Sequence, residues 1–417
     1  MRLALTVRVS CAVLLVAVAS TSVRAGEPFV VAAESSSSHR TAPVGSGEFV
    51  VSWLTVRDPD TDRLEVHGRH FVAETGGTEF PISQFLQEDI VWHRDLDLLG
   101  DRLLALWNVS PSGGPLHEQR AIRSSRRERG GGLPDEGTRR RTLTTTGVPL
   151  SDEEVARGSL AVALPRQRYA LFRPETNAEG IRVGVGQVFD ANDQRVSNPF
   201  EYTAHEAPSA SDSLWNQEVL AMDDGLLVLW IQEQDFNVRN LYAQAFSTLG
   251  VALGELSVIA EEVDSAAALA PAGDGWQAAW LEGDTVYTQR LSPLGQPAGE
   301  VLEVRRAAIT LSISITGDAT GSLLAWSEIE HGALGDSTTF WVSRLDASGR
   351  PLGAATPLME TDGFSHIEAS ALGDGTAVLV WGEPSKTRIM GLLVALAPLF
   401  ADGFESGNTS AWSAVVP

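Results

Sequence analysis

Alternating carboxylates near the start of the chain have the spacing that best suits metal chemistry. Asp58, Asp60 and Asp62 lie in the segment DPDTDRLE, and such carboxylates can gather around Ca²⁺, which prefers hard oxygen ligands. A calcium loop has Gly at its sixth position and Glu at its twelfth, whereas the sixth residue here is not Gly and the twelfth is Arg69. The pattern leaves a calcium site open but favours a polar hairpin tip.

The histidines offer no clear zinc site. His67 and His70 are the closest pair among eight, but residues three apart on a strand face opposite sides and cannot chelate one ion. We therefore expect histidines that are exposed or hydrogen-bonded, with no metal and no cofactor.

Motifs for enzymatic catalysis are also missing. The chain contains no G-x-S-x-G, no H-E-x-x-H, no phosphate-binding loop and no repeated S-x-D-x-G-x-x-W box. Its 54 acidic residues could include a glycosidase-type pair, but nothing in the sequence selects two of them. No catalytic residue is predicted, and we expect a protein without enzymatic activity.

One segment concentrates positive charge. Residues 120–141 contain eight arginines and the run Gly130-Gly131-Gly132, with little apolar content, which predicts a disordered insertion. This insertion could dock an anionic partner or serve only as a solvated loop. The net charge of −23 argues against nucleic acid as a partner, because an acidic protein repels phosphate.

The first 25 residues have the pattern of a secretory signal peptide. Arg2 and Arg8 precede an apolar run from Val9 to Ala19, and Val23-Arg24-Ala25 places small residues at a cleavage site. The lone cysteine, Cys11, precedes most of the apolar run, whereas a lipidation site would follow it. We expect cleavage after Ala25, export to the periplasm, the cell surface or the medium, and no transmembrane segment.

A strand that ends in tryptophan recurs along the chain and determines the expected architecture. Its copies end at roughly 45- to 65-residue intervals, and RYALF is a seventh copy that ends in Phe172. The tryptophans of this set are Trp53, Trp107, Trp230, Trp280, Trp326 and Trp381.

Further strands accompany each tryptophan strand. One short strand precedes it, and Asp-Gly turns join the two in several copies, as at Asp224-Gly225, Asp274-Gly275 and Asp374-Gly375. An alternating strand follows, which we place at residues 116–122 in the second copy, and a short outer strand closes the unit. A turn follows the third strand, with a left-handed residue expected at these positions: Gly76, Asp193, Gly250, Gly295 and Gly349.

Seven units of four antiparallel strands predict an all-β, seven-bladed β-propeller over residues 26–399. The N-terminal strand Phe29–Ala33 has no blade before it, and the last unit lacks an outer strand after Ile389–Leu396. We therefore expect Phe29–Ala33 to complete the last blade and close the ring, because closure removes exposed sheet edges. Residues 400–417 form a C-terminal tail, and we expect a monomer.

The tryptophans divide into two groups by position. Those at the ends of the repeated strands are expected to pack between blades. Five others fall outside that position and are the better candidates for stacking on a sugar: Trp92, Trp215, Trp276, Trp341 and Trp412.

These ordered repeats resemble secreted bacterial β-propeller repeat proteins, in which a G-x-x-V-x-W strand is followed by another strand and a G-x-x-x-G turn. The tail, FADGFESGNTSAWSAVVP, resembles short C-terminal tails of exported bacterial proteins or the opening of a jelly-roll module. The resemblance implies architecture and export, but no ligand. We expect an interaction or ligand-binding module for a protein or glycan. The alternatives are a secreted carbohydrate-active enzyme with carboxylates at the channel mouth and a passive surface scaffold.

Overall fold

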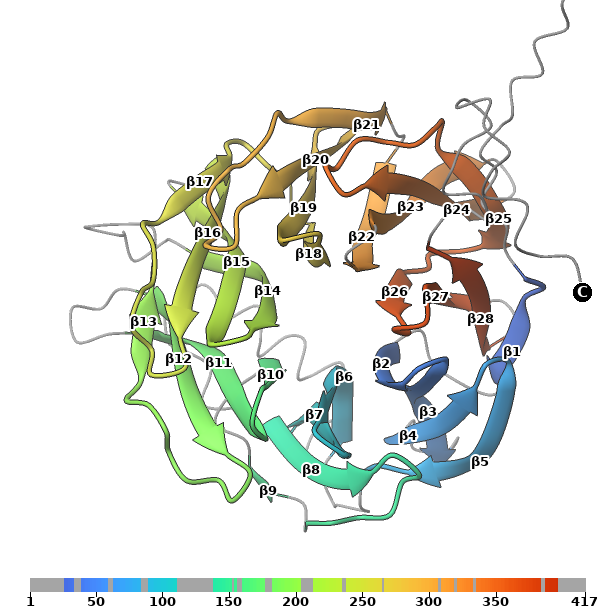
Figure 1. Ribbon diagram of the computed structural model, residues 1–417. Coiled ribbons are helices and arrows are strands. Elements are labelled where there is room, and N and C mark those ends of the chain that lie inside the picture. Colours follow the sequence, from blue (N-terminus) through green and yellow to red (C-terminus); the bar gives the residue numbers. More distant parts are fainter. Residues whose placement is uncertain are drawn as a thin grey trace, which may run out of the picture.

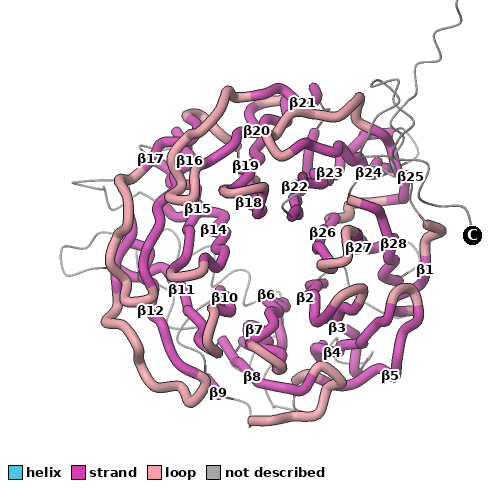
Figure 2. Tube along the Cα trace, viewed as in Figure 1, coloured by secondary structure: helices cyan, strands magenta, loops and turns pink. Residues whose placement is uncertain are grey.

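The structure, a computed structural model, is built from strands alone in the part of the chain that it describes. It describes residues 26–33, 39–58, 63–83, 89–110, 138–151, 154–155, 160–176, 182–203, 213–234, 238–264, 266–306, 309–318, 321–332, 335–383 and 387–396. Within these ranges there are 28 strands and no helix (Figure 2). No helix in these ranges is therefore available to cross a membrane. The predicted signal peptide and C-terminal tail lie outside the described residues.

The strands form seven sheets of four, arranged as blades in a ring, and we call the region that the innermost strands surround the channel (Figure 1). The strands up to the third blade are β1 (Phe29–Ala32), β2 (His39–Gly45), β3 (Glu48–Asp58), β4 (Arg63–Val72), β5 (Thr75–Pro81), β6 (Asp89–Leu99), β7 (Arg102–Ser110), β8 (Thr138–Thr144), β9 (Glu154–Val155), β10 (Leu160–Leu164), β11 (Arg168–Thr176), β12 (Arg182–Asp190) and β13 (Phe200–Tyr202). The remaining strands are β14 (Ser213–Met222), β15 (Gly225–Gln234), β16 (Val238–Ser247), β17 (Ser257–Ala260), β18 (Ala267–Ala272), β19 (Gly275–Glu282), β20 (Thr285–Leu291), β21 (Leu302–Arg306), β22 (Ile309–Asp318), β23 (Gly321–Gly332), β24 (Gly335–Asp346), β25 (Thr356–Asp362), β26 (Ile367–Ala371), β27 (Thr376–Glu383) and β28 (Arg388–Ala395).

The ring closes through its last blade, as predicted. Blades 1 to 6 use consecutive strands, from β2–β5 to β22–β25, whereas blade 7 has the order β1-β28-β27-β26. Strand β1 pairs antiparallel with β28, with Phe29 opposite Gly391. A buried hydrogen bond from His39 Nε2 to the Val380 carbonyl oxygen (3.1 Å) joins blade 1 to blade 7. The protein is thus a seven-bladed β-propeller.

The hydrophobic core consists of seven clusters of buried side chains, one at each interface between neighbouring blades. The six repeated tryptophans are essentially inaccessible to solvent and lie in these clusters, so the predicted packing role is confirmed. Each contacts the preceding blade: Trp230, for example, lies in a cluster with Phe172 and Tyr202 of blade 3. A tryptophan at the same position of the second strand in six blades therefore fills the interface with the preceding blade.

Phe172 does not take the tryptophan position of blade 3, contrary to expectation. Trp230 lies four residues after Leu226, which pairs with Phe246 at the end of the third strand. The corresponding pair in blade 3 is Tyr169 and Phe189, so the equivalent position is Arg173. Phe172 lies one residue earlier, and since side chains alternate along a strand, it packs against blade 4.

The third strand of blade 2 also differs from expectation. Strand β7 pairs with β8, with Trp107 opposite Arg139, whereas the predicted strand at residues 116–122 lies outside the described residues. Arg139, Arg140 and Arg141 belong to β8. The predicted Arg-rich insertion therefore ends before Thr138. The three arginines can belong to a strand because their aliphatic stems can pack within a sheet.

One turn recurs after the third strand in blades 2 to 6. The strand's last large apolar residue bridges to a residue six positions later, as between Phe246 and Ala252. Asp193, Gly250, Gly295 and Gly349 have positive φ angles there, as predicted, and so does Gly147. In blade 1 the prediction for Gly76 is wrong: Gly76 lies within β5, and Ala73 (φ 51°) makes a shorter turn.

The Asp-Gly turns have two different physical causes. Gly375 has φ 80°, the left-handed conformation that glycine tolerates. Gly225 and Gly275 do not have positive φ angles; a Cβ at either would lie 2.2 or 2.3 Å from a carbonyl oxygen of the third strand. Close approach of the backbone, and not a positive φ angle, explains these two glycines.

Candidate functional site

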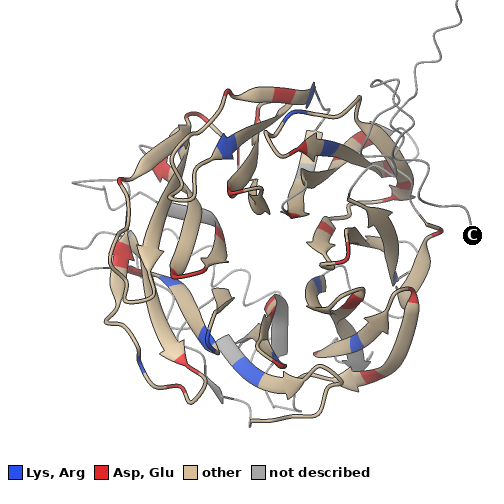
Figure 3. Ribbon diagram, in the orientation of Figure 1, with Lys and Arg blue, Asp and Glu red and all other residues tan. Residues whose placement is uncertain are grey.

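The innermost strands place four charged residues at one level of the channel. This level is defined in each blade by the innermost-strand residue that pairs with the residue just before the tryptophan position on the second strand. In blade 4, for example, Glu218 pairs with Leu229, which precedes Trp230. Figure 3 shows acidic segments on β6, β14 and β26 and a basic segment on β2 beside the channel. From blade 1 to blade 7 the residues at this level are Arg40, Asp95, Leu160, Glu218, Ala268, Ser314 and Glu368.

Two of the acidic residues join their blade to the next one. Asp95 Oδ2 accepts a hydrogen bond from the Ala161 amide (2.9 Å), and Glu368 Oε1 accepts one from the Thr41 amide (3.3 Å). Asp97, one layer away, accepts the Ala163 amide (2.6 Å) in the same manner. Innermost strands are sheet edges, so these carboxylates satisfy amide groups that have no partner strand.

Ser312 and Ser314 do the same between blades 6 and 7. Their hydroxyl oxygens accept the amides of Ile367 (3.2 Å) and Ala369 (3.0 Å). Side-chain acceptors on the innermost strand are therefore a repeated structural device, and most of the channel carboxylates serve it.

Burial shifts the protonation of the channel carboxyls toward neutral pH. It raises the pKa of Asp95, Glu218 and Glu368 to about 7 each. The Arg40 guanidinium lowers all three pKa values in part, while Asp95 and Glu368 raise that of Glu218. Burial lowers the pKa of nearby His366, and Arg40 adds to this effect. The channel charge therefore changes near neutral pH.

Glu218 differs from the other two carboxyls in its bonding. Asp95 and Glu368 are engaged with neighbouring blades, and Glu368 Oε2 is buried without a hydrogen-bond partner among the described residues. Glu218 is partly exposed, and among the described residues no hydrogen bond or ion pair to its carboxyl is found. Glu218 is therefore the channel carboxyl that is open to a ligand.

The segments weighed above for metal binding form no cluster of metal ligands in the described part of the chain. Asp58 ends β3, whereas Asp60 and Asp62 lie outside the described residues. His67 contacts Glu79 (Nδ1–Oε1, 2.7 Å) and Glu65 (Nε2–Oε2, 3.1 Å). His70 contacts Glu48 instead (3.1 Å), so the two histidines have separate partners. Across the described ranges, no three His, Cys, Asp or Glu side chains gather as a metal site would require.

The candidate sugar-stacking tryptophans that can be placed offer no open face. Trp276 is buried, and its Nε1 donates to the Pro293 carbonyl oxygen (3.1 Å). The guanidinium of Arg305 lies 3.6 Å from the ring centroid of Trp341. The side chains of Trp92 and Trp215, and all of Trp412, lie outside what the structure describes. Trp276 and Trp341 are therefore packing residues, contrary to the stacking interpretation.

Comparison with known proteins extends no further than the fold. No protein-family model matches the chain, and no curated protein sequence matches it. The solved Dos1 propeller is 10% identical, with a TM-score of 0.49 over 90% of this chain and 96% of its own. The β-propeller domain of the Trilobed protease from Pyrococcus furiosus is 9% identical, with a TM-score of 0.47 over 90% and 99%.

An enzyme is also among the similar structures. The α-L-arabinanase of Penicillium chrysogenum is 10% identical, with a TM-score of 0.44 over 89% of this chain and 99% of its own. At such identities and TM-scores, none of these proteins informs the function of this one.

Proposed function

We propose that this protein is an exported, non-enzymatic β-propeller that binds a ligand in its central channel through Glu218. The observation that carries the proposal is the open Glu218 carboxyl at a level where three acidic residues face one arginine. An acidic, partly buried site favours a ligand with an ammonium or guanidinium group, since a charge-assisted hydrogen bond would satisfy the carboxylate.

A hydrolytic role is less well supported by the same carboxyls. A glycosidase needs a protonated acid and an ionised partner whose pKa values are pushed apart. Here three carboxyls share a pKa of about 7, and two of them hold adjacent blades together. No pair is set apart as acid and base.

Binding of spermidine and of trilysine, measured by calorimetry on the chain from residue 26 onward, tests the proposal. We expect saturable binding that is tighter at pH 8 than at pH 6, because Glu218 ionises between these values. Glu218→Gln should weaken binding about tenfold or more, whereas Glu201→Gln, on the outer strand of blade 3, should not. The absence of binding at pH 8, or equal binding by Glu218→Gln, would refute a channel site. A parallel polysaccharide hydrolysis assay that gave activity lost in Glu218→Gln would favour the enzyme instead.

Export is inferred from the first 25 residues alone. Their charge and hydropathy pattern supports cleavage after Ala25. Expression of the full chain in a bacterial host should yield an exported form whose mass begins at Gly26. A cytoplasmic product that retains Met1–Ala25 would contradict this inference.

A further inference from the structure

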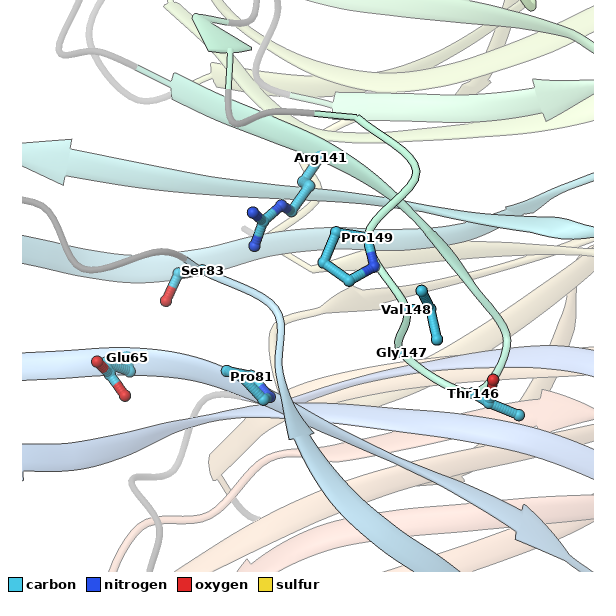
Figure 4. A pocket seen from close by; sticks show the side chains of 8 residues that line it. All are labelled: Glu65, Pro81, Ser83, Arg141, Thr146, Gly147, Val148 and Pro149. Atoms are coloured by element: carbon cyan, nitrogen blue, oxygen red, sulfur yellow. The ribbon is translucent and has the colours of Figure 1, made fainter.

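A groove lies between blades 1 and 2, away from the channel site. It has a volume of about 590 Å³, within the range of small-molecule pockets. Blade 1 contributes Glu65, Pro81 and Ser83, and blade 2 contributes Arg141 and the turn Thr146–Pro149 (Figure 4). In Figure 4 the guanidinium group of Arg141 extends from β8 toward the strands of blade 1.

Arg141 is a buried cation without an acidic partner in the described part of the chain. Its exposed fraction is 4%, and its Nη1 donates to the Ile82 carbonyl oxygen (2.9 Å) while its Nε donates to that of Ser151 (3.4 Å). No described carboxylate forms an ion pair with it. Buried charges are normally paired, and two backbone carbonyls leave N–H groups of the five-donor guanidinium available to an anion.

The charge of Arg141 is specific to blade 2. The same position, two residues before the residue that anchors the recurring turn, is glutamine in blades 3 to 5. Each glutamine Nε2 donates to the carbonyl oxygen ten residues later, as Arg141 Nε does: the pairs are Gln187–Ser197 (3.3 Å), Gln244–Gly254 (3.4 Å) and Gln289–Gly299 (2.9 Å). A neutral side chain therefore suffices for the bond to the carbonyl oxygen ten residues later, and the guanidinium at this place adds the bond to Ile82 and a positive charge beside the groove.

We propose that this groove is a second binding site, independent of the channel, that takes a small zwitterion such as a free amino acid with an apolar side chain. Arg141 binds its carboxylate, because guanidinium and carboxylate form charge-assisted hydrogen bonds. Pro81, Val148 and Pro149 supply an apolar wall for its side chain. Glu65, which already contacts His67 (3.1 Å), supplies negative charge for its ammonium group.

Three related probes test the chemistry: valine has both charges, N-acetylvaline only the carboxylate, and valinamide only the ammonium. Titrations followed by NMR should show saturable binding of valine, weaker binding of N-acetylvaline and none of valinamide. Arg141→Gln should still fold, because glutamine makes the bond to the carbonyl oxygen ten residues later in three other blades. It should weaken valine binding about tenfold or more. Glu65→Gln should remove the preference for valine over N-acetylvaline.

A second pair of variants guards against an indirect effect of Arg141→Gln. Val148 and Val251 hold the same place in the turns of blades 2 and 4 and are 58% and 61% exposed, so either should accept glutamate without loss of fold. Val148→Glu should weaken valine binding by repelling its carboxylate, whereas Val251→Glu should not. Failure of valine to bind, or unchanged binding by Arg141→Gln and Val148→Glu, would overturn the proposal. Neither result bears on spermidine binding in the channel.

Discussion

Protonation of Glu218 links the channel site to stability. Its pKa is raised from 4.5 to about 7, chiefly by burial, so the folded chain binds this proton more tightly than the unfolded chain does. The resulting stabilisation is fully present below pH 4.5 and is lost as the pH rises through about 7. Above pH 7 the buried, ionised Glu218 therefore lowers the stability of the fold, and such groups with shifted pKa values are common at binding sites.

Glu218→Gln should therefore stabilise the protein at high pH. We expect its free energy of unfolding at pH 8 to exceed that of the wild type by roughly 1–3 kcal/mol, with little difference at pH 4.5. Urea unfolding at both pH values measures the effect, with Glu201→Gln as the exposed control. A difference that is the same at both pH values would show that Glu218 does not titrate as described.

Strand β1 is the element that completes the ring, and its two valines differ sharply in environment. Val31 is 0% exposed and lies in the cluster between blades 7 and 1, whereas Val30 is 45% exposed. This difference means that Val31 tests closure and its neighbour Val30 serves as the control.

Val31→Asp should lower the Tm substantially, because an unpaired carboxylate buried among apolar side chains costs about 3 kcal/mol or more. Val30→Asp, on the same strand, should change the Tm little. Thermal unfolding followed by circular dichroism distinguishes the two. Equal effects of the two substitutions would mean that β1 does not pack as the structure shows.

At the scale of the molecule, the sequence predicted the ring but not its site. Seven repeated strands and the unpaired N-terminal strand were sufficient for the architecture, because period-two patterns and large aromatic residues recur in every unit. Arg40, Glu218 and Glu368 lie at one level because each occupies the equivalent pairing position in its own blade, and these pairings are visible only in the structure. Register shifts next to Asp95 and Glu218 change the spacing by one residue in β6 and β14, and no hydropathy pattern shows such a bulge.

Arg141 illustrates the same limit in another way. The sequence places it at the end of an arginine-rich run, where it has no apparent distinction from its neighbours. Its equivalence to glutamines in three other blades becomes visible only after the recurring turns are aligned in space. The composition of residues 120–141 shows a cluster of positive charge. Only the packing in the structure shows that Arg141 is buried.

The pairing of β1 with β28 has a consequence for the making of the protein. The first strand of the propeller needs as its partner a strand from the other end of the propeller, so no growing chain can close the ring until synthesis has passed residue 395. Until then, six blades can assemble one after another through contacts with their neighbours, while β1 has no strand to pair with. Closure is therefore a late, long-range step in folding, and a ribosome that stalls before the last blade leaves an open, incomplete product.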